Sequence, residues 1–185
     1  MRVGLISDVH ANLQALHVVL ARLEEEGVER LVCLGDVVGY GGDPEACVAL
    51  VRERASTCVM GNHDAAAVHP WVRRTFHSSA RLAVEAHSGW LDVSDLAWLA
   101  DLPATARLPD PGPADLFLTH GTPGEEAPFT YLLDEDQAAR ALGSFRERFA
   151  AVGHTHVPAC FHEDAGRDRR VRRRGLRPPP SGPEV

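Results

Sequence analysis

The sequence lacks lysine entirely, and no apolar run approaches the roughly 20 residues that cross a membrane. A protein with membrane-spanning helices is therefore excluded. The first residues form a short apolar run that reaches an acid at Asp8, which is unlike a secretory signal peptide. With 185 residues, 44% hydrophobic and 24% charged, the chain is long enough for one domain with a packed core. We expect a cytoplasmic globular protein.

Cysteines are few and widely spaced. The four of them form no CxxC pair and no dense set, which argues against a disulfide framework. Cys33 and Cys58 fall inside apolar, strand-like runs. We therefore expect buried, reduced thiols, with disulfides as the alternative.

The basic residues are unevenly distributed. All 19 are arginine, and seven of them lie in the last 19 residues. The first 166 residues carry 12 arginines against 24 acidic residues, whereas the tail carries seven against two. Because nucleic acid is bound through its phosphates by positive charge, an acidic body argues against broad nucleic-acid binding. Only the basic tail could serve that purpose.

Short apolar runs alternate with helical patterns along the first 60 residues. Apolar side chains recur at helical spacing from Leu13 to Leu23, and Pro44 opens a second helical stretch. Strands are predicted before, between and after these helices, at residues 2–7, 29–34 and 56–60. This order predicts a parallel sheet with helices packed on it.

The rest of the chain is divided into an insertion, further strands and a tail. A helical insertion over one edge of the sheet is predicted at about 65–101, with helices at 78–87 and 94–100. Strand patterns then return at 104–108, 115–119, 149–152 and 157–161. A further helix is expected at about 134–142, and the domain is placed at 1–163. Residues 164–185 are rich in Arg, Pro and Gly, and we expect them to be disordered.

Polar side chains follow directly after five of the predicted strands. The segments are Asp8-Val9-His10, Gly35-Asp36, Gly61-Asn62-His63-Asp64, His120-Gly121 and Gly153-His154-Thr155-His156. In an open α/β sheet the carboxyl ends of the strands line one crevice, which is where ligands bind. We therefore expect these carboxylate, amide and imidazole groups to meet at one rim.

Such a cluster needs positive charge. Crowded carboxylates and imidazoles are costly unless something neutralises and coordinates them, and divalent metal ions do so. Neutral imidazoles with Asp and Asn oxygens suit Zn, Mn, Fe or Ni better than Ca. Asp8 and His10 are two residues apart, as are His154 and His156, so alternate side chains of an extended segment can point the same way. Seven ligands exceed one transition-metal site, so we predict two ions that share a bridging carboxylate.

The five blocks, in this order and strand context, resemble the calcineurin-like metallophosphoesterase superfamily over roughly residues 1–163. The chain is most similar to its small bacterial phosphodiesterase-type members, which the stretches 35–41, 76–91 and 102–103 also resemble. The resemblance implies an α/β fold, namely a four-layer α/β/β/α sandwich.

The C-terminal tail departs from that resemblance. Members normally continue past the Gly-His-Thr-His block with further strands that complete a second sheet. Here residues 169–180 are rich in Arg and Pro, which excludes a buried strand. We therefore expect the second sheet to be incomplete at the C-terminus. Another subunit covering the exposed edge is the alternative, so a homo-oligomer is left open.

The resemblance also implies a role for each residue of the blocks. It divides the metal ligands between two ions bridged by Asp36: Asp8, His10 and His156 on one, and Asn62, His120 and His154 on the other. His63 would face the phosphate and either donate a proton to the leaving oxygen or stabilise charge. Asp64 would orient His63 by accepting from its second ring nitrogen.

The implied activity is hydrolysis of phosphoester bonds by a metal-bridging hydroxide that attacks phosphorus. We expect Mn to support activity, with Fe, Zn and Ni as alternatives, and a small phosphodiester or nucleotide as substrate. Within the enzyme class, dinucleoside polyphosphate hydrolase and protein phosphatase are the alternatives. A non-catalytic metal-binding scaffold is the alternative from a different class, and the intact Asp36, Asn62, His63 and Asp64 favour the enzyme.

Several other side chains have two interpretations. Tyr40 either stacks on a nucleobase or packs against its own loop. Arg73 and Arg74 either bind a second phosphate or mark a solvated helix end. The remaining histidines have no partner at ligand spacing and are assigned no role: His17, His69, His77, His87 and His162.

Overall fold

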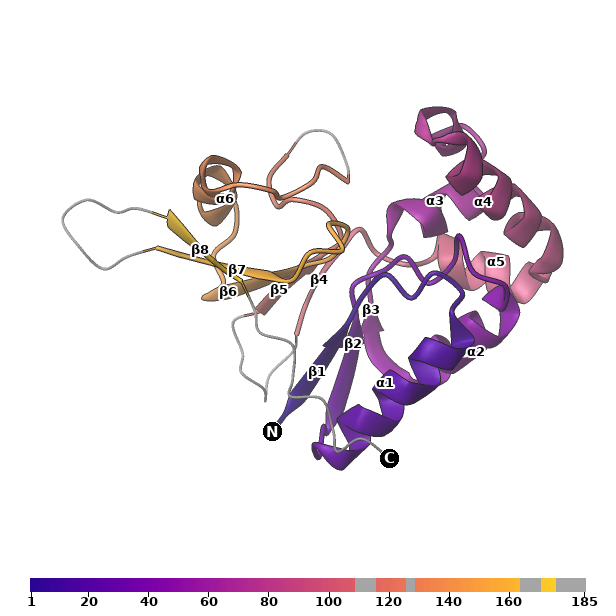
Figure 1. Ribbon diagram of the computed structural model, residues 1–185, viewed down its shortest axis with the longest axis horizontal. Coiled ribbons are helices and arrows are strands. Elements are labelled where there is room, and N and C mark those ends of the chain that lie inside the picture. The colour runs from indigo at the N-terminus through magenta and orange to yellow at the C-terminus, as the bar shows by residue number, and fades with distance from the viewer. Residues whose placement is uncertain (109–115, 126–128, 164–170, 176–185) are drawn as a thin grey trace.

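A computed structural model describes residues 1–108, 116–125, 129–163 and 171–175. These residues form two three-stranded sheets, a two-stranded ribbon and the helices that surround them (Figure 1). The predicted α/β class is confirmed. Within the described ranges, no helix combines the length and the apolar character that a membrane crossing requires.

The first sheet is parallel, with the strand order β1-β2-β3. Its elements are β1 (Val3–Ile6), α1 (Leu13–Glu25), β2 (Arg30–Cys33), α2 (Pro44–Arg54) and β3 (Ala55–Cys58). Asn12 caps α1 by accepting a hydrogen bond from the backbone N–H of Ala15, and Pro44 occupies the first turn of α2. The strand–helix alternation predicted for the first 60 residues is thus confirmed.

A helical segment follows β3 and accounts for the predicted insertion. It comprises α3 (Asn62–Val68), the 3-10 turn η1 (Val72–Thr75), α4 (Ser78–Trp90) and α5 (Val93–Ala100). α3 packs against α4 and α5, and Figure 1 shows these helices grouped beyond β3. The helix α3 was not predicted, although its run of alanines favours a helix. Its first turn carries the Asn62-His63-Asp64 block.

The second sheet has the order β4-β5-β6. β4 (Thr105–Arg107) runs antiparallel to β5 (Leu116–Thr119), and β5 runs parallel to β6 (Phe149–Val152). The helix α6 (Glu135–Leu142) comes before β6 and begins with a capping box formed by Asp134 and Gln137. The parallel pairing of β5 and β6 brings the segments after both strands to the same end of the sheet.

The alternation of side chains along β2 separates two apolar cores. Leu31 and Cys33 pack with residues of α1 and α2, such as Leu20. Val32 points the other way and packs with Leu118 of the second sheet. The first sheet is therefore covered by helices on one face and by the second sheet on the other, while α6 packs against the ribbon (Figure 1).

The ribbon corrects one expectation about the C-terminal tail. β8 (Val171–Gly175) pairs antiparallel with β7 (Ala159–Glu163), so the prediction of disorder over 164–185 is wrong for these five residues. Residues 172–174 are exposed. Pairing with β7 satisfies the backbone groups of β8 without burying a guanidinium, so a strand forms there without apolar side chains. The rest of the predicted tail lies outside the described residues.

Candidate metal centre

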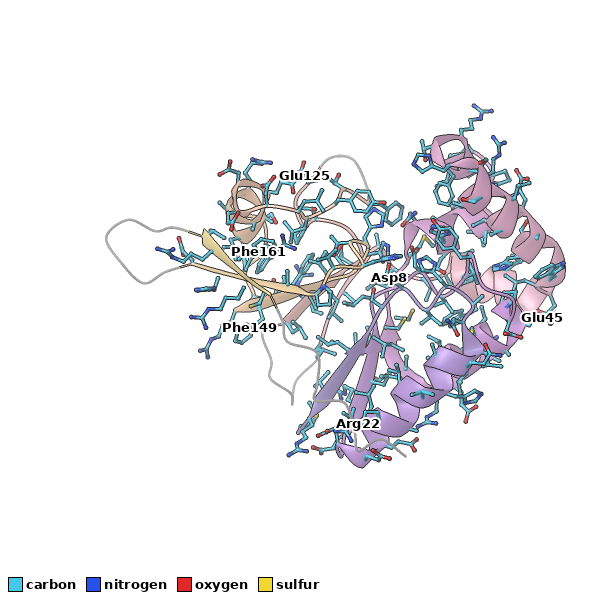
Figure 2. The ribbon with its side chains drawn as sticks, viewed as in Figure 1. Asp8, Arg22, Glu45, Glu125, Phe149 and Phe161 are labelled. Atoms are coloured by element: carbon cyan, nitrogen blue, oxygen red, sulfur yellow. The ribbon has the colours of Figure 1, made fainter. Side chains whose placement is uncertain are left out.

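The structure brings all seven predicted ligands to one place, at the carboxyl ends of the strands. They follow β1 (Asp8 and His10), β2 (Asp36), β5 (His120) and β6 (His154 and His156), or begin α3 (Asn62). Figure 2 shows Asp8 at the junction between the part of the molecule built on β1–β3 and the part built on β4–β6. The fold therefore brings the strand ends together at one polar rim, as the sequence predicts.

Asp8, His10 and His156 form the first donor group. The Nε2 atom of His156 lies 3.2 Å from Oδ1 of Asp8 and 3.2 Å from Nε2 of His10. Nε2 of His10 lies 3.8 Å from Oδ2 of Asp36. One small cation could be bound by all of these atoms after minor adjustment.

Asp36, His120 and His154 form the second donor group. Nε2 of His120 lies 3.3 Å from Oδ2 of Asp36 and 3.1 Å from Oδ1 of Asn62. The same Asp36 oxygen thus faces His10 in the first group and His120 in the second. Asp36 is the residue that connects the two groups.

Backbone carbonyl groups fix the orientation of the imidazoles. Nδ1 of His10 lies 3.1 Å from the carbonyl oxygen of Val38, and Nδ1 of His120 lies 2.7 Å from that of Leu34. Each ring therefore donates its Nδ1–H outward and directs its Nε2 atom toward the centre. This is the arrangement by which metal-ligating histidines are held in proteins.

The charge balance of the centre calls for cations. Burial lowers the pKa of His120, but the hydrogen bond and charge of Asp36, together with Asp8, outweigh burial and raise that pKa to about 9. Burial alone would raise the pKa of Asp36, yet His120, His63 and His10 hold it below its ordinary value. The two carboxylates thus draw a proton onto His120. A divalent ion would supply that positive charge and leave the imidazole neutral, so the donor set fits two divalent metal ions.

Backbone strain is concentrated at the same residues. Five of the seven predicted ligands adopt left-handed conformations with φ between 49° and 70°: Asp8, His10, Asp36, His154 and His156. The other described non-glycine residues with positive φ are Ala11, Tyr40 and Phe129. Such conformations are costly for non-glycine residues and cluster at functional sites.

Asp64 does not contact the ring of His63, contrary to the expectation. Its carboxylate instead accepts four backbone N–H groups, from Asp36, Val37, Val38 and Gly61, at 2.8–3.2 Å. The expectation failed because Asp64, in the first turn of α3, is directed back toward the loop after β2.

The Nδ1 atom of His63 is buried and has no hydrogen-bond partner among the described residues. The backbone N–H of His63 donates to Oδ1 of Asp36 at 2.8 Å. Asp64 and His63 therefore both hold Asp36 in place through backbone hydrogen bonds.

Two residues at the centre were missed by sequence reasoning. His87 is buried, accepts from the N–H of Gly39 at 3.0 Å and donates to the carbonyl of Gly41 at 2.9 Å, so it secures the loop that carries Tyr40. Tyr131 stacks on His154 with ring centroids 3.9 Å apart. No sequence motif indicates a role for either residue, because each contacts residues that are distant in sequence.

Arg73 resolves one of the open alternatives. Its Nε donates to the carbonyl of Ala66 and its Nη2 to that of Ala67, at 2.6 and 2.9 Å. These carbonyls belong to the end of α3, where a cation satisfies unpaired acceptors. Arg73 therefore stabilises the end of α3 through part-buried hydrogen bonds, and the two interpretations of Arg74 stay open.

Comparison with known proteins identifies the family. The chain matches the model of the calcineurin-like phosphoesterase superfamily domain over residues 1–172. The chain belongs to this superfamily. The match spans all five motif blocks of this calcineurin-like domain, and the resemblance inferred from them is confirmed.

Solved and curated proteins are similar to this chain. A metallophosphoesterase from Sphaerobacter thermophilus is 38% identical with a TM-score of 0.72, over 88% of this chain and 63% of that one. An uncharacterised protein of Methanocaldococcus jannaschii is 31% identical over 163 residues, 88% of this chain and 65% of that protein. A hypothetical protein from Pyrococcus horikoshii OT3 shares the fold at 16% identity and a TM-score of 0.64, over 94% of this chain and 87% of that one. This calcineurin-like chain spans less than two thirds of the length of the first two.

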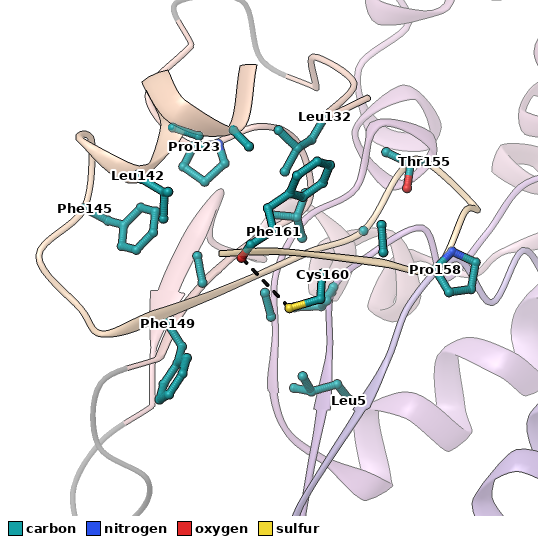
Figure 3. Close-up of a pocket in the computed structure, with 18 of the residues that line it drawn as sticks. Leu5, Pro123, Leu132, Leu142, Phe145, Phe149, Thr155, Pro158, Cys160 and Phe161 are labelled. Atoms are coloured by element: carbon teal, nitrogen blue, oxygen red, sulfur yellow. Dashed lines mark hydrogen bonds between the residues drawn. The ribbon is translucent and has the colours of Figure 1, made fainter. Parts of the chain in front are cut away.

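An apolar cavity of about 520 Å³ lies beside the centre, between α6 and the strands β6 and β7 (Figure 3). Phe145, Phe149 and Phe161 are among the side chains that line it, and none of the seven predicted ligands does. This cavity is therefore separate from the polar rim that the predicted ligands form.

Proposed function

We propose that this protein hydrolyses small phosphoesters, phosphodiesters or small nucleotides, with two divalent metal ions bound by the seven ligands. The observation that carries the proposal is the position of Asp36. Its buried carboxylate oxygen lies 3.8 Å from His10 in one donor group and 3.3 Å from His120 in the other. A shared carboxylate of this kind is what a pair of adjacent metal ions requires.

The proposed ligands are the two donor groups with Asn62: Asp8, His10 and His156 for one ion, His120, His154 and Asn62 for the other, and Asp36 for both. Two such ions supply Lewis acidity toward phosphoryl oxygens and lower the pKa of water, and Mn²⁺ is the ion we propose for activity. The imidazoles are pre-oriented by backbone carbonyls, so little reorganisation is needed.

His63 is the proposed acid or charge-stabilising group. Its ring is buried beside His10 and Tyr40, with ring centroids 4.7 Å away in both cases, and Phe76 packs at 4.7 Å. The backbone hydrogen bond to Asp36 fixes the start of α3. From this position the imidazole can donate a hydrogen bond to the leaving oxygen of a phosphate held at the centre.

The test uses the full chain, loaded with Mn²⁺ and assayed with bis-p-nitrophenyl phosphate; a wider ester panel is run with Mn²⁺, Ni²⁺ and Zn²⁺. We expect His63→Ala to keep two ions per chain, measured by elemental analysis, and to lose at least about 100-fold in kcat, as general acid catalysis contributes on that order. Asp36→Asn should bind fewer ions. His77→Ala, at an exposed position in front of α4, is the matched control.

The outcomes separate the roles. Unchanged turnover in His63→Ala would show that the acid assignment is wrong. A wild-type protein that binds two ions but hydrolyses no ester in the panel would support the non-catalytic scaffold instead.

A further inference from the structure

Two tyrosines flank the metal centre from different parts of the fold. Tyr131, in the segment between β5 and α6, stacks on His154 with an interplanar angle of 12° and centroids 3.9 Å apart. Half of its surface, 50%, is nevertheless exposed. Because the imidazole covers one face of the ring, a ligand that contacts Tyr131 must use the opposite face or the ring edge.

Tyr40 lies on the side of the first sheet, after β2. Its ring centroid is 4.8 Å from His10 and 4.7 Å from His63. It is 53% exposed and has φ of +63°. A bulky residue at positive φ is strained, and a side chain so exposed gains little from packing to offset the strain. Packing against its own loop therefore does not account for Tyr40.

Each tyrosine adjoins a different group of predicted ligands: Tyr131 contacts His154, and Tyr40 contacts His10. Burial raises the pKa of Tyr40, and Tyr131 and Asp36 raise it further. Tyr40 and Tyr131 therefore adjoin the two donor groups that Asp36 connects. A phosphate bound at Asp36 and its neighbours would have one aromatic ring on each side.

The loop that carries Tyr40 is held rigidly. His87 pairs with the N–H of Gly39 and the carbonyl of Gly41, which are the two residues that flank Tyr40. The strained conformation is thereby fixed by a buried side chain from α4. A ring that is fixed before the ligand arrives binds with a smaller loss of conformational entropy.

We propose that Tyr40 and Tyr131 form an aromatic clamp that binds the nucleobase of a nucleotide substrate. A planar base offers a π face to each exposed ring, and stacking of this kind tolerates any base. The clamp rests on the proposed function only in placing the phosphate of the substrate at the metal ligands. It makes Tyr40 and Tyr131 specificity residues of that site.

The test compares two phosphates that differ only in the base. The dissociation constants of AMP and ribose 5-phosphate are measured by isothermal titration calorimetry on the Mn²⁺-loaded full chain, and phosphorus NMR verifies that AMP stays intact. We expect wild type to bind AMP at least about tenfold more tightly, since base stacking on aromatic side chains contributes on that order. Tyr40→Ala and Tyr131→Ala should each lose about fivefold or more of this preference, and the two Phe variants should keep it.

Controls separate stacking from damage to the metal centre. Each variant should still bind two Mn²⁺ and bind ribose 5-phosphate as wild type does. Phe149→Ala removes an equally exposed aromatic ring at the start of β6, which Figure 2 shows away from Asp8, and should change nothing. Comparing the dissociation constants of phenyl phosphate and methyl phosphate tests the alternative that the two tyrosines bind the ring of an aryl ester and not a nucleobase.

Three results would overturn the clamp. These are no preference for AMP in wild type, a preference that survives both Ala variants, or a gain with phenyl phosphate but none with AMP. Hydrolysis of bis-p-nitrophenyl phosphate is measured separately. Hydrolysis without base preference refutes the clamp and leaves the proposed function standing. Base preference without hydrolysis supports the clamp and refutes the proposed function.

Discussion

Replacing Asp64 by Asn should destabilise the fold by several kcal/mol, although the change exchanges one oxygen for an amino group. The carboxylate accepts four backbone N–H groups. Oδ1 accepts from Val37 at 2.9 Å and Val38 at 3.2 Å, and Oδ2 accepts from Asp36 at 2.8 Å and Gly61 at 2.9 Å. The side chain thus joins the loop after β2 to the start of α3.

The magnitude follows from counting acceptors. An asparagine has one side-chain oxygen, so in either orientation its amino group faces two of the four N–H donors. Asp64 is fully buried, so water cannot replace the lost acceptor. Each buried N–H left without a partner costs about 1–3 kcal/mol, which gives about 2–6 kcal/mol for the pair. A domain has roughly 5–15 kcal/mol in total, so much of the stability would be lost.

The assay is urea unfolding at pH 8 in the presence of a chelator, so that metal binding does not contribute. Burial and the charge of Asp36 raise the pKa of Asp64 to about 6, and at pH 8 the carboxylate is therefore ionised. Asp92→Asn is the control, since Asp92 accepts one N–H, from Asp95, as the N-cap of α5, and Asn caps equally well. If Asp64→Asn unfolds within about 1 kcal/mol of wild type, the four hydrogen bonds do not hold this junction together.

Two further outcomes concern the loop that carries Tyr40. Gly39→Ala should destabilise the fold by more than about 1 kcal/mol in the same urea assay, because φ is +96° and a Cβ would overlap Nδ1 of His63. Gly42→Ala should not destabilise the fold, because a Cβ there would meet open space. Equal losses of stability in the two variants would contradict this prediction. Burial lowers the pKa of His87, with His10 acting in the same direction, so protonation in the unfolded state should remove stability as pH falls below about 6.5. Unfolding free energies at pH 8 to 5 should fall more steeply for wild type than for His87→Gln, by up to about 1.4 kcal/mol per pH unit, and parallel curves would refute the assignment.

Most of the fold near the centre was predictable because its determinants are local. Leu16 and Leu20 recur at helical spacing, Pro44 starts a helix, and apolar strands alternate with these helices, which specifies a parallel sheet. The carboxyl ends of such strands meet at one edge. The residues that follow them, including Asp8 and Asp36, could therefore be assigned to one site before any contact was known.

What could not be predicted depends on contacts distant in sequence. The resemblance implied that Asp64 orients His63, but the first turn of α3 directs the carboxylate to a loop 26–28 residues earlier. Tyr131 reaches His154 across α6 and β6. β8 forms because β7 offers a strand partner, which apolar patterning does not record. In each case the deciding interaction is a backbone or packing contact that no local pattern specifies.

The distribution of backbone strain extends the site beyond its ligands. Asp and His tolerate left-handed conformations better than most residues, which fits the five strained ligand positions. Ala11, Tyr40 and Phe129 are not of these types, and yet all three adjoin the centre: Ala11 follows His10, Tyr40 contacts His10, and the ring of Phe129 lies edge-on to His120 with centroids 5.9 Å apart. Strain is retained only where the surrounding structure fixes it, as His87 fixes the residues on either side of Tyr40 and backbone hydrogen bonds to Val37 and Asp43 fix Ala11. Strained backbone therefore extends from the predicted ligands to aromatic residues beside them, which is the region where we propose that substrate specificity is decided.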